Sequence, residues 1–432
     1  MRWLVGTISA ILTALICNLA WSGSHDLPFG WFLWYVPGIH AQQEPEVVYT
    51  PRSSDGALGF VDQGDGVRRI ECEEDWYYTQ ATFLPDDDGD GWAELALAVR
   101  RASTCGNDVQ GRLEILSGFS MTPIGVFSGS VDFHLERSDA NDFLMLQYDG
   151  WGWKSAQVLD DLPSKERWRT GWGGWSLHGG RGPTFVGDVD GDGFHDMAVG
   201  NAFDSTRDRR DEWTGTVRVF SGRDGRPLWV CERSGANTCF GSGVAPAGDW
   251  NEDGTPDVAG LAHDSLCILS GRDGALLDEL SFAAGQEMRD VTAVGDLDSD
   301  GRADFLLRGG SSSEGAHPVV YASGSRQPLD VTAGWDLVWA AANGDLDGDG
   351  RDDLVLGRID PESGELRLST FSQNALADVR SLGADGRAWD DVGQAEVGRF
   401  HEDGPWCASL TLLPPRGSFL SDGGTVLLVE GK

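Results

Sequence analysis

Residues 188–200 spell DVDGDGFHDMAVG, an acidic loop that runs directly into an apolar strand. The pattern is Asp-x-Asp-x-Asp-Gly-x-x-Asp, with carboxylates at positions 1, 3, 5 and 9 and a glycine at position 6. It returns as DDDGDGWAELALAV from Asp86, DWNEDGTPDVAGLA from Asp249, DLDSDGRADFLLRG from Asp296 and DLDGDGRDDLVLGR from Asp345. Five copies in one chain indicate a repeat architecture.

The copies recur roughly every 50 residues, a period typical of repeat folds. The copies at Asp86 and Asp188 are farther apart, and a degraded copy, HLERSDANDFLMLQ from His134, lies between them and keeps the apolar strand after Asp142. A second degraded copy, GRFHEDGPWCASLTLL, places Arg399 at position 1 of a final unit. The sequence therefore contains seven units, five of them with a near-intact acidic loop.

Each unit also carries strands beyond its acidic loop. The segments GTVRVFSGRDGRPLWV (215–230) and SLCILSGRDGALLDEL (265–280) have the pattern of β-hairpins, with an Asp-Gly pair suited to the turn. A unit is thus strand, acidic loop, strand, loop, strand, turn and strand, which is typical of a propeller blade. We predict an all-β fold, a seven-bladed β-propeller of four-stranded antiparallel blades, over residues 42–432.

The last unit predicts how the ring closes. It ends with GGTVLLVEGK (423–432), which matches a third strand and leaves no fourth. We expect an N-terminal strand from within 45–75 (EVVYT, ALGFV or VRRIEC) to complete this blade. Closure of this kind removes the exposed edge that an open array would leave.

The N-terminus has the features of an export signal. Arg2 precedes WLVGTISAILTALICNLA (3–20), a mostly apolar run without charge. Cleavage at Ala20 or at Ala41 would remove it, so residues 1–41 are assigned to the signal and an N-terminal segment. An uncleaved membrane anchor is the alternative, because the run nearly has the length of a spanning helix. We expect a secreted, periplasmic or cell-surface protein, with no membrane insertion beyond this segment.

The charge balance excludes some classes of partner. The chain has 69 acidic and 33 basic residues and a formal net charge of -36. Such a surface repels nucleic-acid phosphates and anionic lipid headgroups. The acidic residues are concentrated in the repeated loops, where clustered carboxylates call for a cation.

Six cysteines follow the apolar run. In an oxidising compartment we expect disulfides, with Cys231 and Cys239 pairing across a short turn-rich segment and Cys72 and Cys105 stapling the first unit. Two others, Cys267 and Cys407, lie in apolar strands and are predicted to be buried thiols.

The acidic loops suit Ca²⁺. Three carboxylates at alternate positions of a tight loop converge on one point, and Ca²⁺ takes six to eight oxygen ligands in irregular geometry. Up to five ions are expected, and all protein ligands of each come from one loop without a recurring base, which indicates a structural role. The assigned ligands are Asp86, Asp88, Asp90 and Glu94; Asp188, Asp190, Asp192 and Asp196; Asp249, Asn251, Asp253 and Asp257; Asp296, Asp298, Asp300 and Asp304; and Asp345, Asp347, Asp349 and Asp353. The alternative is a set of solvated acidic turns without metal.

The repeats resemble the FG-GAP repeats of the integrin α-chain N-terminal propeller and its bacterial relatives. Phe240-Gly241 followed by Val244-Ala245-Pro246 before Asp249 is similar to the motif that names the family. The resemblance covers roughly 80–432 and implies seven blades with Ca²⁺ in the first inter-strand loop of several of them. It also implies that the two units with degraded loops are metal-free, and that ligands bind on the face away from the metals.

An aromatic and cationic cluster is predicted on the face opposite the acidic loops. Alternating connections of an antiparallel blade share one face, which places RWRTGWGGWSLHGGRG (167–182) and DSTRDRRDEWTG (204–215) together. Sugars stack on aromatic faces, and arginine pairs with acidic groups. The candidate ligand-binding residues are Trp168, Trp172, Trp175, Arg207, Arg209, Arg210 and Trp213. The alternative is that these tryptophans pack between blades.

No sequence motif for catalysis stands out. The chain has no HExxH, GxxxxGK[ST] or GxSxG pattern, and its 8 histidines have no recurring spacing. We therefore expect a non-catalytic binding or adhesion module for a protein or glycan. The alternative is an extracellular polysaccharide-acting enzyme, such as a lyase, on a propeller scaffold. The sequence leaves the oligomeric state open.

Overall fold

The computed structural model describes residues 48–430 with interruptions, the longest at 102–109, 172–182, 203–214, 310–318, 384–391 and 413–424. The chain divides into two compact units, Met1–Glu46 and Val47–Lys432, and everything below concerns the second. Its described elements are all strands, and no described helix is long and apolar enough to cross a membrane. The predicted export signal lies outside the described residues.

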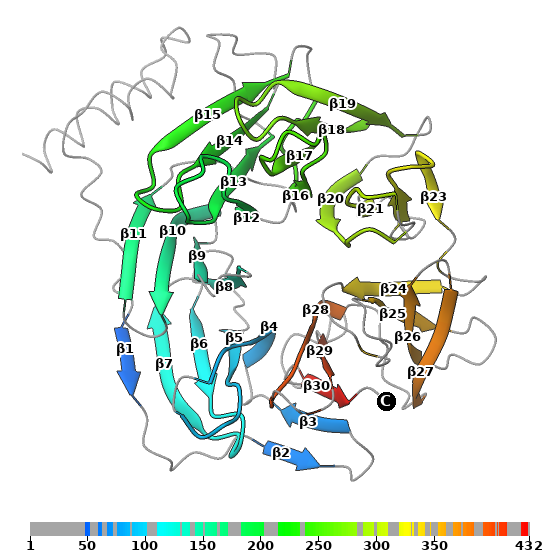
Figure 1. The fold of residues 1–432 in the computed structure, drawn as a ribbon. Coiled ribbons are helices and arrows are strands. Elements are labelled where there is room, and N and C mark those ends of the chain that lie inside the picture. Colours follow the sequence, from blue (N-terminus) through cyan, green and yellow to red (C-terminus); the bar gives the residue numbers. More distant parts are fainter. Residues whose placement is uncertain are drawn as a thin grey trace, which may run out of the picture. The chain divides into compact units, whose positions relative to one another are not determined.

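The described strands form seven antiparallel sheets, which we call blades 1 to 7 in chain order (Figure 1). Written from one edge to the other, blade 1 is β1 (Val48–Pro51), β7 (Pro123–Gly129), β6 (Gly111–Leu116), β5 (Leu95–Arg101) and β4 (Trp76–Phe83). Blade 2 is β11 (Lys165–Gly171), β10 (Gly152–Asp161), β9 (Phe143–Asp149) and β8 (Asp132–Arg137). Blade 3 is β12 (Thr184–Gly187), β13 (Asp196–Asn201), β14 (Thr216–Phe220) and β15 (Pro227–Glu232).

The remaining blades follow the same order. Blade 4 is β16 (Val244–Gly248), β17 (Asp257–Leu261), β18 (Ser265–Leu269) and β19 (Leu276–Ser281). Blade 5 is β20 (Met288–Ala293), β21 (Phe305–Gly309), β22 (Val319–Ala322) and β23 (Gln327–Leu329). Blade 6 is β24 (Asp336–Ala341), β25 (Leu354–Ile359), β26 (Leu366–Ser372) and β27 (Ala375–Gly383). Blade 7 is β2 (Gly59–Asp62), β3 (Val67–Glu71), β30 (Thr425–Glu430), β29 (Cys407–Leu412) and β28 (Val392–Gly398).

The fold is an all-β propeller with four-stranded antiparallel blades, as the repeats predict. The first strand of a blade lies innermost, because β4, β8, β12 and β16 contact one another in succession, and so do β16 and β20 and the strands β24, β28 and β4. Apolar clusters fill the space between neighbouring sheets, as in the one that joins Val186 and Val219 of blade 3 to Val244 and Val258 of blade 4. Burial between blades therefore holds the ring together.

An N-terminal strand completes blade 7. The strand β3 pairs antiparallel with β30, so that Ile70 lies opposite Val426, and this is the VRRIEC segment that the missing fourth strand predicts. The other two candidate segments, EVVYT and ALGFV, also contain strands, at outer edges that were not predicted. The strand β2 pairs with β3, and β1 pairs with β7 of blade 1, which makes these two sheets five-stranded. The N-terminal region thus covers the outer edges of two blades.

A tryptophan of blade 2 packs on a turn of blade 3. The turn between β14 and β15 is the pentapeptide SGRDG (221–225), and its Gly225 adopts a φ of 72°. The indole N–H of Trp168 in β11 donates to the carbonyl oxygen of Gly222 at 2.7 Å. The indole ring covers Gly225, where a Cβ atom would lie 2.8 Å from the ring. Only glycine fits this contact.

The same contact joins blade 3 to blade 4. The turn between β18 and β19 repeats SGRDG at 270–274. The indole N–H of Trp229 in β15 donates to the carbonyl oxygen of Gly271 at 2.6 Å, and the ring covers Gly274, where a Cβ atom would lie 2.7 Å away. We call this arrangement the tryptophan–glycine contact. Its repetition shows that the SGRDG turn serves the joint between blades as well as the hairpin.

One predicted disulfide is wrong. Cys231 is a free thiol, so it forms no bridge to Cys239. The reason is its place in β15, where Cys231 packs against the apolar cluster shared by blades 3 and 4. Cys267 is a buried thiol and Cys407 is buried, as predicted. The cysteines of the other predicted bridge, at positions 72 and 105, lie outside the described residues.

Candidate metal centre

In the four acidic loops whose first aspartate is described, this residue organises the backbone of the loop. In blade 3, Asp188 Oδ1 accepts hydrogen bonds from the N–H groups of Gly191 at 2.7 Å and Asp192 at 3.0 Å, and Oδ2 accepts from Gly193 at 2.8 Å. Gly191 and Gly193 adopt φ values of 74° and 90°, which other residues rarely tolerate. The bond from the position 6 glycine to the first aspartate recurs in the loops that begin at Asp86, Asp249 and Asp296. The loops are therefore folded in the same way.

The position 9 carboxylate is buried and joins two parts of its blade. In blade 3, Asp196 has no exposed surface, and its Oδ2 accepts from Val189 N–H at 2.8 Å and Asp190 N–H at 3.2 Å. Its Oδ1 accepts from Gly222 N–H at 2.9 Å, in the SGRDG turn. The carboxylate thus links the acidic loop to the turn between the third and fourth strands.

The same links occur in other blades. The residue at position 2 donates its N–H to the position 9 carboxylate in blades 4, 5 and 6, over distances of 2.8 to 2.9 Å. The second link, from the turn, recurs from Gly271 to Asp257 at 2.9 Å and from Ser323 to Asp304 at 2.7 Å. The sequence predicted position 9 only as a metal ligand. Its structural role was missed because the partner from the turn lies far along the chain.

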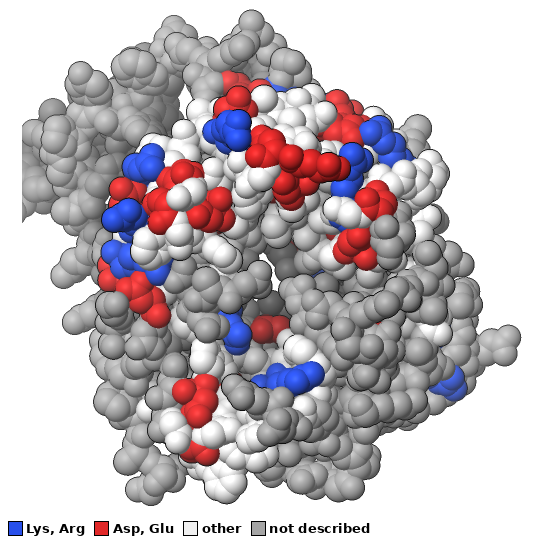
Figure 2. All heavy atoms as spheres, in the orientation of Figure 1, with Lys and Arg blue, Asp and Glu red and all other residues white. Residues whose placement is uncertain are grey.

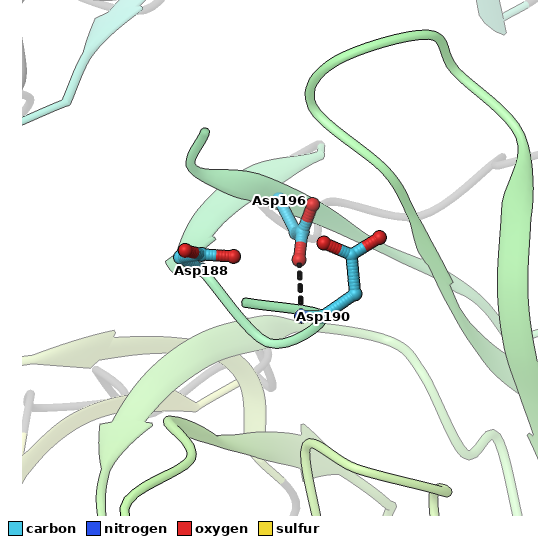
Figure 3. Close-up of side chains that lie close together, drawn as sticks. All are labelled: Asp188, Asp190 and Asp196. Carbon is cyan, nitrogen blue, oxygen red and sulfur yellow. Dashed lines mark hydrogen bonds between the residues drawn. The ribbon is translucent and has the colours of Figure 1, made fainter. Parts of the chain in front are cut away.

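Three carboxylates converge in the blade 3 loop. Asp188, Asp190 and Asp196 each offer an oxygen, and these oxygens lie within 4.8 Å of one another (Figure 3). Oxygens of this spacing can be shared by one Ca²⁺, since each Ca²⁺–oxygen distance is about 2.3–2.6 Å. The fourth assigned ligand, Asp192, accepts a hydrogen bond from Phe194 N–H at 3.1 Å. The residues present fit a calcium ion, to be completed by carbonyl oxygens or water.

The other loops match this arrangement to different degrees. The blade 4 loop is described in full, and its acidic side chains do not form such a group. There Asn251 Oδ1 accepts from Asp253 N–H at 2.9 Å, so the amide at position 3 is engaged within the loop. Of the remaining assigned ligands, the described ones are Asp86, Asp90, Glu94, Asp296, Asp300, Asp304 and Asp353, whereas Asp88, Asp298, Asp345, Asp347 and Asp349 lie outside the described residues.

The carboxylates of blade 3 carry an electrostatic cost. Burial raises the pKa of Asp196 to about 7, with the charge of Asp190 as a smaller cause. Burial and the neighbouring Asp192 charge also raise the pKa of Asp190. Arg226 offsets part of this cost, because its guanidinium lies 2.6 Å from Asp190 Oδ2. A divalent ion among these groups would favour their ionised forms.

Acidic side chains are spread around one face of the ring. Figure 2 shows them in separate clusters on the face in view, with basic side chains beside several of them. The basic partners include residues of the SGRDG turns. In blade 4, Arg272 lies 3.8 Å from Asp253 Oδ2.

The degraded loop of blade 7 is held in another way. Arg399 occupies position 1, and its guanidinium lies 4.2 Å from the ring centroid of Trp406 at position 8. Position 9 is Cys407, which is buried and cannot supply the carboxylate links. Phe400 at position 2 is buried and packs edge-on against Phe83 of blade 1 at 5.0 Å. At position 1, an arginine in a cation–π contact takes the place of the aspartate of the near-intact loops.

The predicted ligand-binding cluster is described only in part. Trp168 is buried and takes part in the tryptophan–glycine contact, which is the packing alternative for this residue. Its Nε1 donates a hydrogen bond to Gly222 and its ring packs on Gly225, so Trp168 offers little surface to a ligand. The other members, Trp172, Trp175, Arg207, Arg209, Arg210 and Trp213, lie outside the described residues.

Comparison with known proteins agrees with the repeat. Residues 184–220, which span the acidic loop of blade 3 and its first three strands, match the FG-GAP repeat, and the predicted resemblance holds there. No curated protein matches the chain. Among solved structures, the crystal structure of Chaetomium thermophilum Raptor is similar, with 12% sequence identity and a TM-score of 0.47. That match covers 87% of this chain and 29% of Raptor, so the chain spans less than a third of the length of Raptor.

Proposed function

We propose that this chain is an exported, calcium-stabilised propeller that acts as a non-catalytic binding or adhesion module for a protein or glycan. The FG-GAP match and the propeller of four-stranded blades support a binding module in general. Export is proposed from the uncharged apolar run at 3–20 that follows Arg2. The proposed location is therefore outside the cytoplasm, as a secreted, periplasmic or cell-surface protein.

The proposal includes a closed ring of seven blades. Seven sheets, first strands that contact one another and the pairing of β3 with β30 support it. Closure by β3 brings the two ends of the propeller into one sheet. An FG-GAP ring of this kind presents loops on both faces for binding, on a scaffold that buries its sheet edges.

The single observation that carries the calcium proposal is the convergence of Asp188, Asp190 and Asp196. Up to five ions are proposed, one for each near-intact acidic loop. Each ion would be held by the carboxylates and carbonyls of one loop and would stabilise that loop. The ion would neutralise the carboxylates of its loop, among them the buried Asp196.

The experiment is a pair of measurements on the purified chain. Thermal unfolding is recorded with a chelator and with millimolar Ca²⁺, and the bound calcium is counted by atomic emission. We expect a higher Tm with Ca²⁺ and several bound ions. An unmoved Tm and no bound calcium would remove the metal from the proposal.

The binding role is tested on printed arrays of glycans and of extracellular-matrix proteins. Retention on one of them without new reducing or unsaturated ends in the eluate supports a binding module. Product formation on a retained polysaccharide would replace it with the enzymatic alternative.

A further inference from the structure

A pocket lies between the acidic loops of blades 3 and 4. Its volume is about 430 Å³, which lies within the range of ~300–1,000 Å³ usual for small-ligand sites. One wall comes from Asp188 and Asp190 of the blade 3 loop, and another from Thr255 of the blade 4 loop and Arg272 of the SGRDG turn. Trp229 supplies an aromatic surface between them. Two blades are therefore needed to form it.

Trp229 is held rigidly in this pocket. Its nitrogen donates to Gly271 O and one part of its ring covers Gly274, so the indole cannot turn away. The equivalent Trp168 makes the same contact but is buried, with only 9% of its surface exposed. Trp229 is partly buried and lines the pocket. Because the indole is already fixed and accessible, less side-chain entropy is lost when a ligand binds to it.

The polar groups are of both signs. Asp190 offers carboxylate oxygens that accept hydrogen bonds, of which Oδ2 already pairs with Arg226, whereas the oxygens of Asp188 accept from the backbone of their own loop. Arg272, with a side chain that is 66% exposed, offers donors. A ligand rich in hydroxyl groups can donate hydrogen bonds to a carboxylate and accept them from Arg272. An anionic ligand meets a chain of net charge -36, and a cationic ligand meets Arg272 and the Ca²⁺ proposed among Asp188, Asp190 and Asp196. A neutral, hydroxyl-rich ligand matches both.

We propose that this pocket binds one or two rings of a neutral saccharide, with the apolar face of a ring on Trp229 and its hydroxyls between Asp190 and Arg272. The proposal rests on the proposed binding function and assigns it a ligand class and a second location. This location is on the acidic-loop face, opposite the face where the sequence placed the ligand. The pocket volume and the aromatic wall favour a sugar over an extended peptide.

The blocking variant follows from the repeat itself. Position 7 of the acidic loop is Thr255 in blade 4, Trp92 in blade 1 and Phe194 in blade 3. An aromatic residue is therefore compatible with this loop. Thr255→Phe would fill the pocket and keep the backbone bond from residue 255 to Asp253. A second variant, Arg272→Ala, removes the donor without touching the tryptophan–glycine contact.

The matched control is Arg223→Ala. Arg223 has the same place in the SGRDG turn of blade 3 as Arg272 has in blade 4, but it does not line the pocket. Instead, its guanidinium lies 5.8 Å from the ring of Phe194. Arg223→Ala and Arg272→Ala thus each remove one surface arginine and leave the same net charge, so that they differ only in whether the arginine lines the pocket.

The test uses a set of neutral disaccharides (cellobiose, maltose, lactose, mannobiose, xylobiose and chitobiose) with digalacturonate and a tetralysine peptide as charged comparisons. Binding to the full chain in millimolar Ca²⁺ is measured by saturation-transfer NMR and by tryptophan fluorescence. We expect at least one neutral disaccharide to bind, Arg272→Ala to weaken it about tenfold, Thr255→Phe to abolish it and Arg223→Ala to leave it unchanged. The Tm of every variant is recorded to show that it is folded.

Several results would overturn the pocket. The first is that no neutral disaccharide binds. The second is that digalacturonate or tetralysine binds more tightly than every neutral disaccharide. The third is that Arg223→Ala and Arg272→Ala weaken binding equally. A glycan or protein that is retained on the arrays equally by wild type and Thr255→Phe would also overturn it, yet it would leave the proposed binding function intact.

Discussion

The acidic loop of blade 3 and the degraded loop of blade 7 occupy the same place in their blades but differ in the described residues at positions 1 and 9. In blade 3, Asp188 bonds to the backbone of its own loop and Asp196 connects that loop to the SGRDG turn. In blade 7, Arg399 lies over Trp406, and Cys407 replaces the buried carboxylate. Both loops lead into a buried second strand, β13 or β29. The propeller scaffold therefore does not require the carboxylates at every blade.

The difference shows what the carboxylates add. A buried acid such as Asp196 is costly, as its raised pKa indicates, and blade 7 shows that a blade can form without it. The five near-intact copies retain both the buried acid and the ligand positions around it. The position 9 carboxylate links two connections of its blade, and an ion would tie it to the rest of the loop. We infer that these loops are adapted to hold a cation.

The largest effect is expected from the buried link itself. Asp196→Ala leaves the N–H groups of Val189 and Gly222 without their acceptor, which should cost about 3 kcal/mol or more of stability. Cys407→Ala at the same position of blade 7 removes one small buried side chain and should cost about 1–2 kcal/mol. Tm measured by calorimetry for both variants gives the comparison. Equal losses would mean that the two loops depend on position 9 in the same way.

The calcium response should separate the two loops next. With Ca²⁺ at about 100 times its Kd, one site adds about 2.7 kcal/mol of stability. Asp188→Asn with Asp190→Asn should remove one bound ion and that part of the Tm increase. Arg399→Ala in blade 7 should change neither the calcium count nor the Ca²⁺-induced shift. If the double variant kept its full complement of calcium, these carboxylates would not be ligands.

A third comparison uses pH and depends on Asp196. Its folded pKa of about 7 is above the ordinary value of 3.8, so without metal the folded state binds the extra proton between these values. The contribution of Asp196 to stability therefore falls as pH rises through this window when a chelator is present. Ca²⁺ needs the ionised carboxylate, so calcium affinity should instead rise about tenfold from pH 6 to pH 8. Calcium titrations at both pH values, with Asp196→Asn as control, measure this. Equal affinities at pH 6 and pH 8 would contradict the assignment.

Much of the fold followed from the sequence because its signals are local. The spacing of the aspartates and Gly193 defines the acidic loop, and the apolar run after Asp196 defines β13. The missing fourth strand of the last unit indicated that a strand such as β3 must return to β30. The second role of Asp196 could not be predicted, because Gly222 reaches it only through the packing of the blade.

The wrong disulfide and the features that the sequence did not resolve also have a physical cause. Cys231 and Cys239 are near in sequence, but β15 directs Cys231 into the cluster between blades 3 and 4. The indole of Trp168 was a candidate for ligand binding, and its burial depends on Gly225 in the next blade. The pocket beside Trp229 combines residues of two blades, and no local pattern marks it. Contacts across blades decide these three cases.

The smallest effect is expected at the position that distinguishes the degraded loop. Arg399→Ala removes the guanidinium from the face of Trp406, and an exposed cation–π contact contributes about 0.5–1 kcal/mol. Arg399→Lys keeps the charge but loses the planar stacking, so it should lie between wild type and alanine. Arg399→Asp restores the carboxylate of position 1, yet Cys407 still withholds the one at position 9, so it should lower Tm and gain no calcium. Tm and calcium counts for the three variants test this order. A stabilised, calcium-loaded Arg399→Asp would show that a single carboxylate separates the two kinds of loop, and that the buried acid is dispensable for the ion.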